Sequence, residues 1–208
     1  MKGVKLFSAL LAFALMAMVA TSGTAFAAKT IKLHHLNKDD PFDNPTGAMA
    51  TVFKSLVEAG TNGSVMVQTF PSGQLGKDKD AVQQVKGGVI QSGIHSVGGF
   101  ASVYPLIGIL DIPFAFPNIS KTYEVFDGPF GAKLAGDIEE KTGLHVLGFG
   151  DSGGFFHITN SKRPIHTPAD MDGIKIRTMG LDTHKAIITA MGGQPAAISW
   201  SEVYTALQ

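Results

Sequence analysis

The chain has 208 residues, of which 44% are hydrophobic and 16% are charged, so it is long and apolar enough to fold around a core. It carries 17 basic and 17 acidic residues with no basic stripe, which argues against a nucleic-acid partner. It contains no cysteine, and this excludes disulfides, thiolate catalysis and thiolate metal sites.

The N-terminus has the pattern of a secretion signal. Lys2 and Lys5 precede an almost wholly apolar run, Leu6–Ala20, and Ala25-Phe26-Ala27 fits the small-x-small rule for cleavage. The run is short for a membrane span, so an uncleaved anchor is the weaker alternative. We therefore predict a signal peptide over residues 1–27 and a mature protein in the periplasm.

Residues 28–151 are predicted to form a first α/β lobe. Alternating apolar and polar residues predict strands, and apolar residues three or four apart predict helices. Because the two kinds of element alternate, we expect a largely parallel sheet. The predicted strands are Thr30–His34, Ser64–Phe70, Ile94–Val97 and Leu144–Phe149, and the predicted helices are Thr46–Gly60, Asp78–Val89 and Ser120–Lys141. In the first of these helices, Val52 and Leu56 are expected to belong to the buried face.

Residues 152–208 are predicted to begin a second α/β lobe. Thr167, Pro168 and Asp170 form the pattern of a helix start, and Ser199 with Glu202 forms a second one. Between them the expected elements are a short strand, Ile174–Arg177, and a helix whose apolar stripe runs from His184 to Met191; Phe155–Thr159 is strand-like.

Candidate ligand residues follow from these elements. In parallel sheets ligands sit beyond the carboxyl ends of the strands, where Asn37 and Gly99 are expected. Arg177 has two interpretations: a surface arginine paired with Asp170 or Asp172, or a guanidinium aimed at a ligand carboxylate between the lobes. Trp200, the only tryptophan, either packs in the fold or stacks on a ligand.

Other chemistries have less support. Gly150-Asp-Ser-Gly-Gly154 fits the G-x-S-x-G pattern of serine hydrolases, but a strand-like run follows it where a nucleophile elbow needs a helix. A glycine-rich crossing between lobes is the favoured interpretation, and an exported serine hydrolase is the alternative. The seven histidines show no metal-ligand spacing, since His34 and His35 are neighbours on one strand and point to opposite faces. No metal or cofactor is expected.

Five motifs, in order behind the signal segment, resemble the DctP-type substrate-binding proteins of TRAP (tripartite ATP-independent periplasmic) transporters. They are Phe70-Pro-Ser-Gly-Gln-Leu-Gly76, Asp111-Ile-Pro-Phe114, Thr159-Asn-Ser-Lys-Arg-Pro-Ile165, Pro168-Ala-Asp-Met-Asp-Gly-Ile-Lys-Ile-Arg177 and Ser201-Glu-Val-Tyr-Thr-Ala-Leu-Gln208.

The resemblance implies two α/β lobes of the periplasmic-binding-protein type, hinged and closing over a small organic acid. It implies a non-enzymatic, monomeric protein that delivers its ligand to the small and large subunits of a membrane permease driven by an ion gradient. Family members extend well past Gln208. The resemblance therefore implies a nearly complete first lobe and a partial, C-terminally truncated second lobe.

The resemblance also assigns binding roles. By position, Arg177 matches the arginine that clamps the ligand carboxylate, Trp200 an aromatic pocket position and Asn37 a polar position after the first strand. Phe156-His157 stands where many members carry a second arginine, and Ser96 and Gly99 stand where sialic-acid binders place charged residues. These differences favour a monocarboxylate with an apolar or aromatic body, stacked between Trp200 and Phe156.

Overall fold

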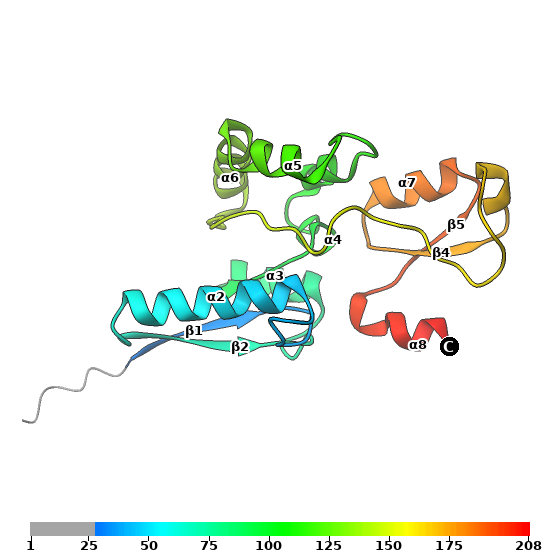
Figure 1. Cartoon of the computed structure of the whole chain (residues 1–208). Coiled ribbons are helices and arrows are strands. Elements are labelled where there is room, and N and C mark those ends of the chain that lie inside the picture. Colours follow the sequence, from blue (N-terminus) through cyan, green and yellow to red (C-terminus); the bar gives the residue numbers. More distant parts are fainter. Residues whose placement is uncertain (1–27) are drawn as a thin grey trace, which may run out of the picture.

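The computed structural model describes residues 28–208, so the predicted signal peptide lies outside the described residues. It contains a three-stranded parallel sheet in the order β2-β1-β3 and a separate two-stranded parallel sheet, β4-β5 (Figure 1). Among residues 28–208, no helix combines the length and the hydrophobicity that crossing a membrane requires.

The first sheet is built around β1 (Lys29–His34), which pairs with β2 (Val65–Phe70) along its whole length and with the short β3 (Ser92–Gly93) at its end. The first two strands match their predictions. The third does not: it is Ser92–Gly93, and the predicted strand Ile94–Val97 instead leads into a helix.

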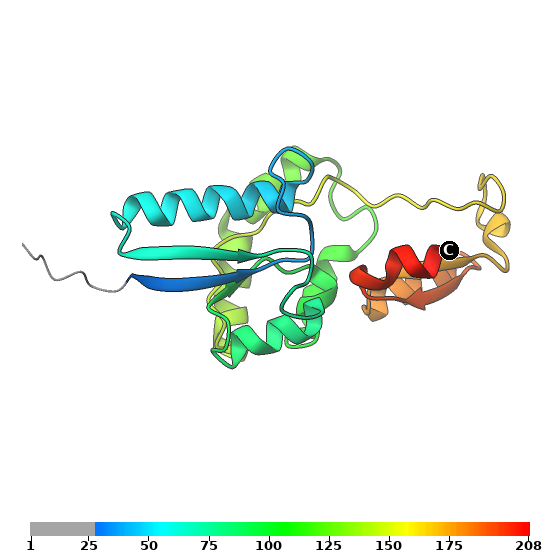
Figure 2. The same cartoon turned by 90° about the horizontal axis from the view of Figure 1, so that it is seen from below.

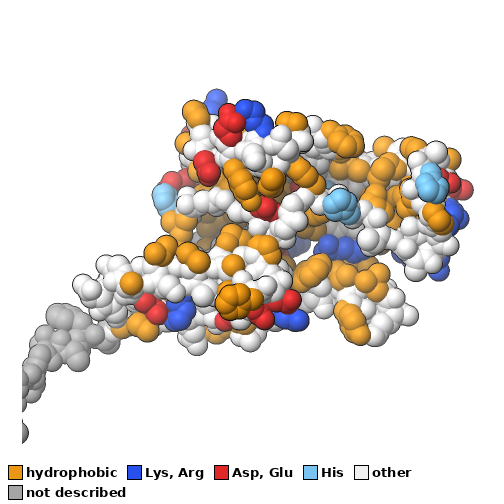
Figure 3. Space-filling view, viewed as in Figure 1, with side chains coloured by type: hydrophobic (Ala, Val, Ile, Leu, Met, Phe, Trp, Pro, Cys, Tyr) orange, Lys and Arg blue, Asp and Glu red, His pale blue; other side chains and the backbone are white. Residues whose placement is uncertain are grey.

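Helix α2 (Pro45–Gly60) covers this sheet and begins at Asn44, whose side chain accepts a hydrogen bond from the Gly47 N–H at 2.7 Å. Its buried side is narrower than predicted. Val52 and Leu56 are 56% and 68% exposed, and hydrophobic side chains gather over α2 on the face shown in Figure 3. The helix therefore presents an apolar surface as well as a packed one.

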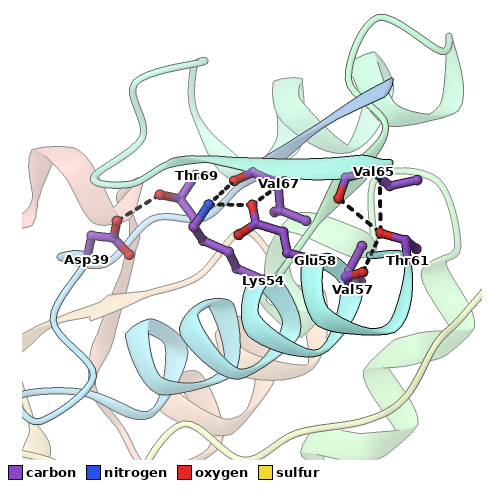
Figure 4. Close-up of polar contacts among 8 residues, drawn as sticks. All are labelled: Asp39, Lys54, Val57, Glu58, Thr61, Val65, Val67 and Thr69. Carbon is purple, nitrogen blue, oxygen red and sulfur yellow. Dashed lines mark hydrogen bonds and ion pairs between the residues drawn. The ribbon is translucent and has the colours of Figure 1, made fainter. Parts of the chain in front are cut away.

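Polar side chains of α2 complete the outer edge of β2 (Figure 4). The Lys54 ammonium donates to the Val67 carbonyl at 2.7 Å, and the Val67 N–H donates to the Glu58 carboxylate at 2.9 Å. Because Lys54 and Glu58 also pair at 2.6 Å, the edge is closed by a network of three groups. An edge strand whose backbone is satisfied in this way cannot readily pair with another chain.

Helix α3 (Asp78–Lys86) connects β2 to β3. Four helices follow β3: α4 (Val97–Phe100), the 3-10 helix η1 (Pro105–Asp111), α5 (Ile119–Phe126) and α6 (Pro129–Thr142). The predicted single helix Ser120–Lys141 is thus two helices, separated at residues 127–128. Pro129 stands at the first position of α6, where proline starts a helix more readily than it continues one. Tyr104, Ile107, Leu134 and Ile138 form the core of this region.

Residues 144–166 run as an extended segment from the first lobe to the second (Figure 2). No backbone–backbone hydrogen bond described for residues 28–208 involves it. The predicted strands Leu144–Phe149 and Phe155–Thr159 are therefore wrong. Val146 and Phe149 do pack against the core, but a strand also needs a ladder partner. The predicted lobe boundary, residues 151–152, falls within this segment and stays a prediction.

The second lobe contains η2 (Pro168–Met171), β4 (Lys175–Thr178), α7 (Asp182–Ala190), β5 (Gln194–Ala197), η3 (Trp200–Glu202) and α8 (Val203–Leu207). Its core is Met171, Ile174, Ile176 and Ile188. The predicted helix start before η2 is present, because the Asp170 carboxylate accepts from the Thr167 N–H at 2.8 Å. Strand β5 was not predicted.

The two lobes touch through η1, α4 and the start of α7. Met179 lies against Gly98, where an added Cβ would come within 2.6 Å of the Met179 Cβ. Nearby, the His184 imidazole is 3.2 Å from the buried Asp111 carboxylate. At the exposed surface the Lys77 ammonium and the Glu202 carboxylate are 2.6 Å apart.

Candidate ligand-binding site

Arg177 is held at the end of β4 by the alternation of that strand. Ile176 points into the core of the second lobe, so Arg177 points to the opposite side. Its Nε donates to the Ile198 carbonyl at 2.9 Å, and its guanidinium carbon lies 5.8 Å from the centre of the Trp200 ring. Burial lowers the pKa of Arg177 below the ordinary value of an arginine. The group nevertheless stays charged at neutral pH.

Within residues 28–208, no carboxylate lies at ion-pair distance from Arg177. The interpretation of Arg177 as a partner of Asp170 or Asp172 is therefore wrong. A different arginine serves that turn: Arg163 donates to the backbone carbonyls of both aspartates, through Nε to Asp170 at 2.9 Å and through a terminal nitrogen to Asp172. Sequence reasoning missed this role, although Arg163 stands just before the turn it closes.

A small cavity of about 70 Å³ opens beside Arg177, between the β4-β5 sheet and α8. It is lined by Lys175, Arg177, Ala196, Ile198, Val203, Ala206 and Leu207. Two cations thus stand on an otherwise apolar wall. This combination suits a ligand with a carboxylate at one end and an apolar portion at the other.

The aromatic candidates are not brought together. Trp200 is 52% exposed and lies next to Arg177. Phe156 is 73% exposed and meets the His184 ring edge-to-face, with ring centres 5.2 Å apart. The contacts described for residues 28–208 join Phe156 to neither Trp200 nor Arg177, and His157 is exposed on the extended segment.

The first-lobe candidates already have partners within the fold. The Asn37 amide donates to the Thr46 hydroxyl at 3.2 Å. Ser96 donates to the Asp78 carboxylate through its hydroxyl at 2.5 Å and its N–H at 2.9 Å. Gly99 lies against the same carboxylate, because an added Cβ would come within 2.4 Å of it.

Asp78 is the common neighbour of Ser96 and Gly99, and it was not among the predicted site residues. Its carboxylate also lies 2.7 Å from the His95 Nδ1. Burial alone would raise the pKa of Asp78, but the hydrogen bonds and charge of His95 and the hydrogen bonds from Ser96 outweigh burial, so the pKa falls below 3.8. Asp78 is therefore a buried carboxylate held in its charged form.

The Gly150–Gly154 motif does not form a nucleophile elbow. The Asp151 carboxylate accepts hydrogen bonds from the N–H groups of Gly153 and Gly154, each at 2.6 Å, and from the Tyr123 hydroxyl at 2.8 Å. Ser152 is exposed, and none of the hydrogen bonds described for residues 28–208 joins it to a histidine or a carboxylate. The arrangement is that of a turn fixed by an aspartate and gives no support to a hydrolase.

Comparison with known proteins identifies the family of this chain. The model of DctP, bacterial extracellular solute-binding protein family 7, matches residues 37–208. The chain belongs to this family. The predicted membership and the α/β two-lobe fold are thereby confirmed.

Three relatives illustrate the match. The 2,3-diketo-L-gulonate-binding periplasmic protein of Escherichia coli is 30% identical over 204 residues, which are 98% of this chain and 61% of that protein. The sugar acid binding protein of Advenella mimigardefordensis, solved with galactonate, has a TM-score of 0.80 and 31% identity, over 88% of this chain and 57% of that one. The TRAP periplasmic solute-binding protein of Sulfurospirillum deleyianum, solved with succinate, has a TM-score of 0.78 and 34% identity, over 88% and 57%.

This DctP-family chain therefore spans about three fifths of the length of the relatives it matches. That fraction includes the β4-β5 sheet with Arg177 and Trp200.

Proposed function

We propose that this chain is the periplasmic solute-binding component of a TRAP transporter and that it captures a small organic acid through Arg177. The proposal rests on the unused hydrogen-bond donors of the Arg177 guanidinium. Arg177 donates one hydrogen bond to the Ile198 carbonyl and has no carboxylate partner within residues 28–208. It lies beside Trp200 and lines a cavity. A carboxylate can accept two parallel hydrogen bonds from such a group.

The chemistry of the relatives supports the same ligand class. One relative is named for binding 2,3-diketo-L-gulonate, and two others were solved with galactonate and succinate; each of these ligands is a small carboxylate. We infer that the chain is exported by its 1–27 segment, acts as a monomer without catalysis, and hands its ligand to the small and large permease subunits.

The rest of the proposed site follows from the candidate residues. Trp200 stacks on the body of the ligand, while Asn37, Ser96 and Gly99 contribute to the first-lobe wall. Phe156 and His157, which are exposed on the segment between the lobes, are proposed to contribute to the wall of the site and not to the clamp.

We further propose a monocarboxylate with an apolar or aromatic body. Trp200 is half-exposed, and the cavity beside Arg177 is lined mostly by aliphatic side chains. A polyol acid would leave hydroxyl groups unpaired against such a wall, at about 1–3 kcal/mol each.

Isothermal titration calorimetry with phenylacetate, pyruvate, succinate and galactonate tests the ligand body. We expect the aromatic acid to bind most tightly, because its ring buries apolar surface on Trp200. Tight galactonate binding without any response to phenylacetate would rule out the apolar body and keep the carboxylate clamp. Absence of heat for every acid would contradict both.

Substitution of Arg177 tests the clamp itself. Arg177→Ala removes two charge-assisted hydrogen bonds, so we expect a loss of about 3 kcal/mol, or roughly 100-fold in Kd. The matched control is Lys162→Ala, which removes one exposed positive charge away from the cavity and should leave Kd unchanged. Equal losses in both variants would show that only the overall charge matters.

The hydrolase alternative has its own measurement. Ser152→Ala should change neither ligand affinity nor any ester turnover. An activity that the wild-type protein shows and Ser152→Ala abolishes would establish the serine hydrolase.

A further inference from the structure

Three side chains that are far apart in the sequence meet inside the first lobe. His34 is the last residue of β1, Asp78 is the first residue of α3, and His95 follows β3. One ligand atom from each lies within 4.8 Å of the other two. The rings of His34 and His95 are also stacked, with centres 5.7 Å apart and planes inclined by 26°. The fold therefore builds a compact cluster of two imidazoles and a carboxylate.

Three of the four ring nitrogens of this cluster lack hydrogen-bond partners among the described residues. His34 is fully buried, yet neither of its ring nitrogens has a hydrogen-bond partner among the described residues, and the Nε2 of His95 has none either. Buried polar groups are almost always satisfied by protein, water or a bound ion. The cluster thus sets an unpartnered imidazole, His34, beside the paired His95 and Asp78, which points to an occupant that accepts imidazole.

The cluster is also held in place by its surroundings. Asp78 is fixed by Ser96 on one side and by the His95 Nδ1 at 2.7 Å on the other. An ion that displaces the proton between Asp78 and the His95 Nδ1 can be bound by both groups as two of its ligands. The side chains of Asp78 and His95 each remain 9% exposed, so an ion can enter from their side while His34 closes the base.

We propose that His34, Asp78 and His95 bind a divalent transition-metal ion, with Zn²⁺ as the best fit. Two imidazoles and a carboxylate form a common zinc donor set, and a water can complete the tetrahedron. Ca²⁺ and Mg²⁺ are excluded by their need for shells built mainly of oxygen. Ligands around zinc stand about 3.3 Å apart, given bonds of about 2.0–2.1 Å. Closing the cluster from 4.8 Å therefore takes only small side-chain rotations.

The proposed ion lies at the carboxyl ends of β1 and β3, directly behind Ser96 and Gly99. It would brace the first-lobe wall without touching Arg177 in the second lobe. The proposal is independent of the proposed function, because metal content can be measured without any organic acid. Failure of one leaves the other standing.

The experiment uses the full chain purified without a histidine tag. The protein is stripped with a chelator, incubated with Zn²⁺, passed through a desalting column and analysed for metal by mass spectrometry. We expect about one Zn²⁺ per chain in the wild type and less than a tenth of that in His95→Gln. His145→Gln is the matched control, because His145 also pairs with a carboxylate, Glu139 at 3.0 Å, but is exposed and outside the cluster. It should keep the full amount.

A second measurement covers the case in which a cluster variant does not fold. Co²⁺ added to the stripped wild-type chain should give the visible absorption of a four-coordinate site, and an equimolar amount of Zn²⁺ should bleach it. A wild-type chain that holds no Zn²⁺ and gives no such absorption overturns the proposal. Full zinc retention in a folded His95→Gln variant overturns it as well.

Discussion

The two lobes end their strands in opposite ways. At the end of β1 in the first lobe, His34 is fully buried in a cluster with Asp78 and His95, and Asp78 makes three close polar contacts with His95 and Ser96. At the end of β4 in the second lobe, Arg177 is half-buried and uses one donor on the backbone. At the carboxyl end of a parallel strand, a polar side chain can therefore be either packed among partners within the fold or left with unused hydrogen-bond donors. Only the second arrangement is ready for an organic ligand.

The largest expected effect is a loss of folding stability in acid, caused by His34 at the end of β1. Burial, together with the charge of His95, lowers the pKa of His34 to about 4, whereas an unfolded histidine titrates near 6.5. The unfolded chain therefore binds the extra proton between these values, and stability falls as pH drops from about 6.5 to 4. At about 1.4 kcal/mol per pKa unit, the loss is roughly 3 kcal/mol.

Urea unfolding in the presence of a chelator, at a series of pH values, measures this loss. Asp78 acts in a separate window: its lowered pKa supplies stability that is present above about pH 3.8 and is lost below it. A flat profile in the wild type would mean that His34 is not buried as a neutral group.

The packing around Asp78 can be broken by one methyl group. Gly99→Ala would place a Cβ 2.4 Å from the Asp78 carboxylate and push it off Ser96. We expect a loss of about 2 kcal/mol in the free energy of unfolding. Gly136→Ala is the matched control, since nothing lies within 4 Å of its added Cβ and alanine favours a helix by about 0.5–1 kcal/mol. The two variants should therefore change stability in opposite directions.

Arg163 and Arg177 of the second lobe are expected to have different roles, the first in stability and the second in ligand binding. Arg163→Ala removes hydrogen bonds to two backbone carbonyls, so we expect about 1 kcal/mol less stability and an unchanged ligand Kd. Arg177→Ala should do the reverse and lower affinity with little loss of stability. Thermal unfolding and calorimetry on both variants separate the roles. If both lost affinity, the turn closed by Arg163 would belong to the site.

The smallest effect is expected at the surface contact between the lobes. Lys77 and Glu202 form an ion pair at 2.6 Å, but each side chain is about half exposed. Solvent and salt screen such pairs. Lys77→Ala should change the unfolding midpoint within experimental error, and the double variant with Glu202→Ala should match it. A large, salt-sensitive change would show that this pair holds the lobes together.

Much of the backbone was predictable because local pattern and tertiary context agree there. The sequence of β1 alternates apolar and polar residues from Thr30 to His34, and β4 places Ile176 inward and Arg177 outward as its sequence predicts. The predicted strand at residues 144–149 was wrong because apolar residues indicate burial but do not show whether a neighbouring strand is available for pairing. Strand β5 was missed since Pro195 lies within it, and proline reads as a break although an edge strand tolerates it.

The site was predictable to a smaller extent. The position of Arg177 on its strand could be read from Ile174 and Ile176, and its neighbour Trp200 from the helix start that follows. The assembly of His34, Asp78 and His95 could not, because it depends on how β1, α3 and the end of β3 come together. Sequence spacing shows metal sites only when the ligands lie close along the chain.

The extended segment 144–166 has one further consequence. Its amides have no backbone acceptors among the described residues, so hydrogen–deuterium exchange should label most of them faster than those of β1 and β2. The amides of Gly153 and Gly154, which donate to the Asp151 carboxylate, should exchange more slowly than the rest of the segment. A protease would find its first cleavage points here, and the fragments released would map onto the two lobes.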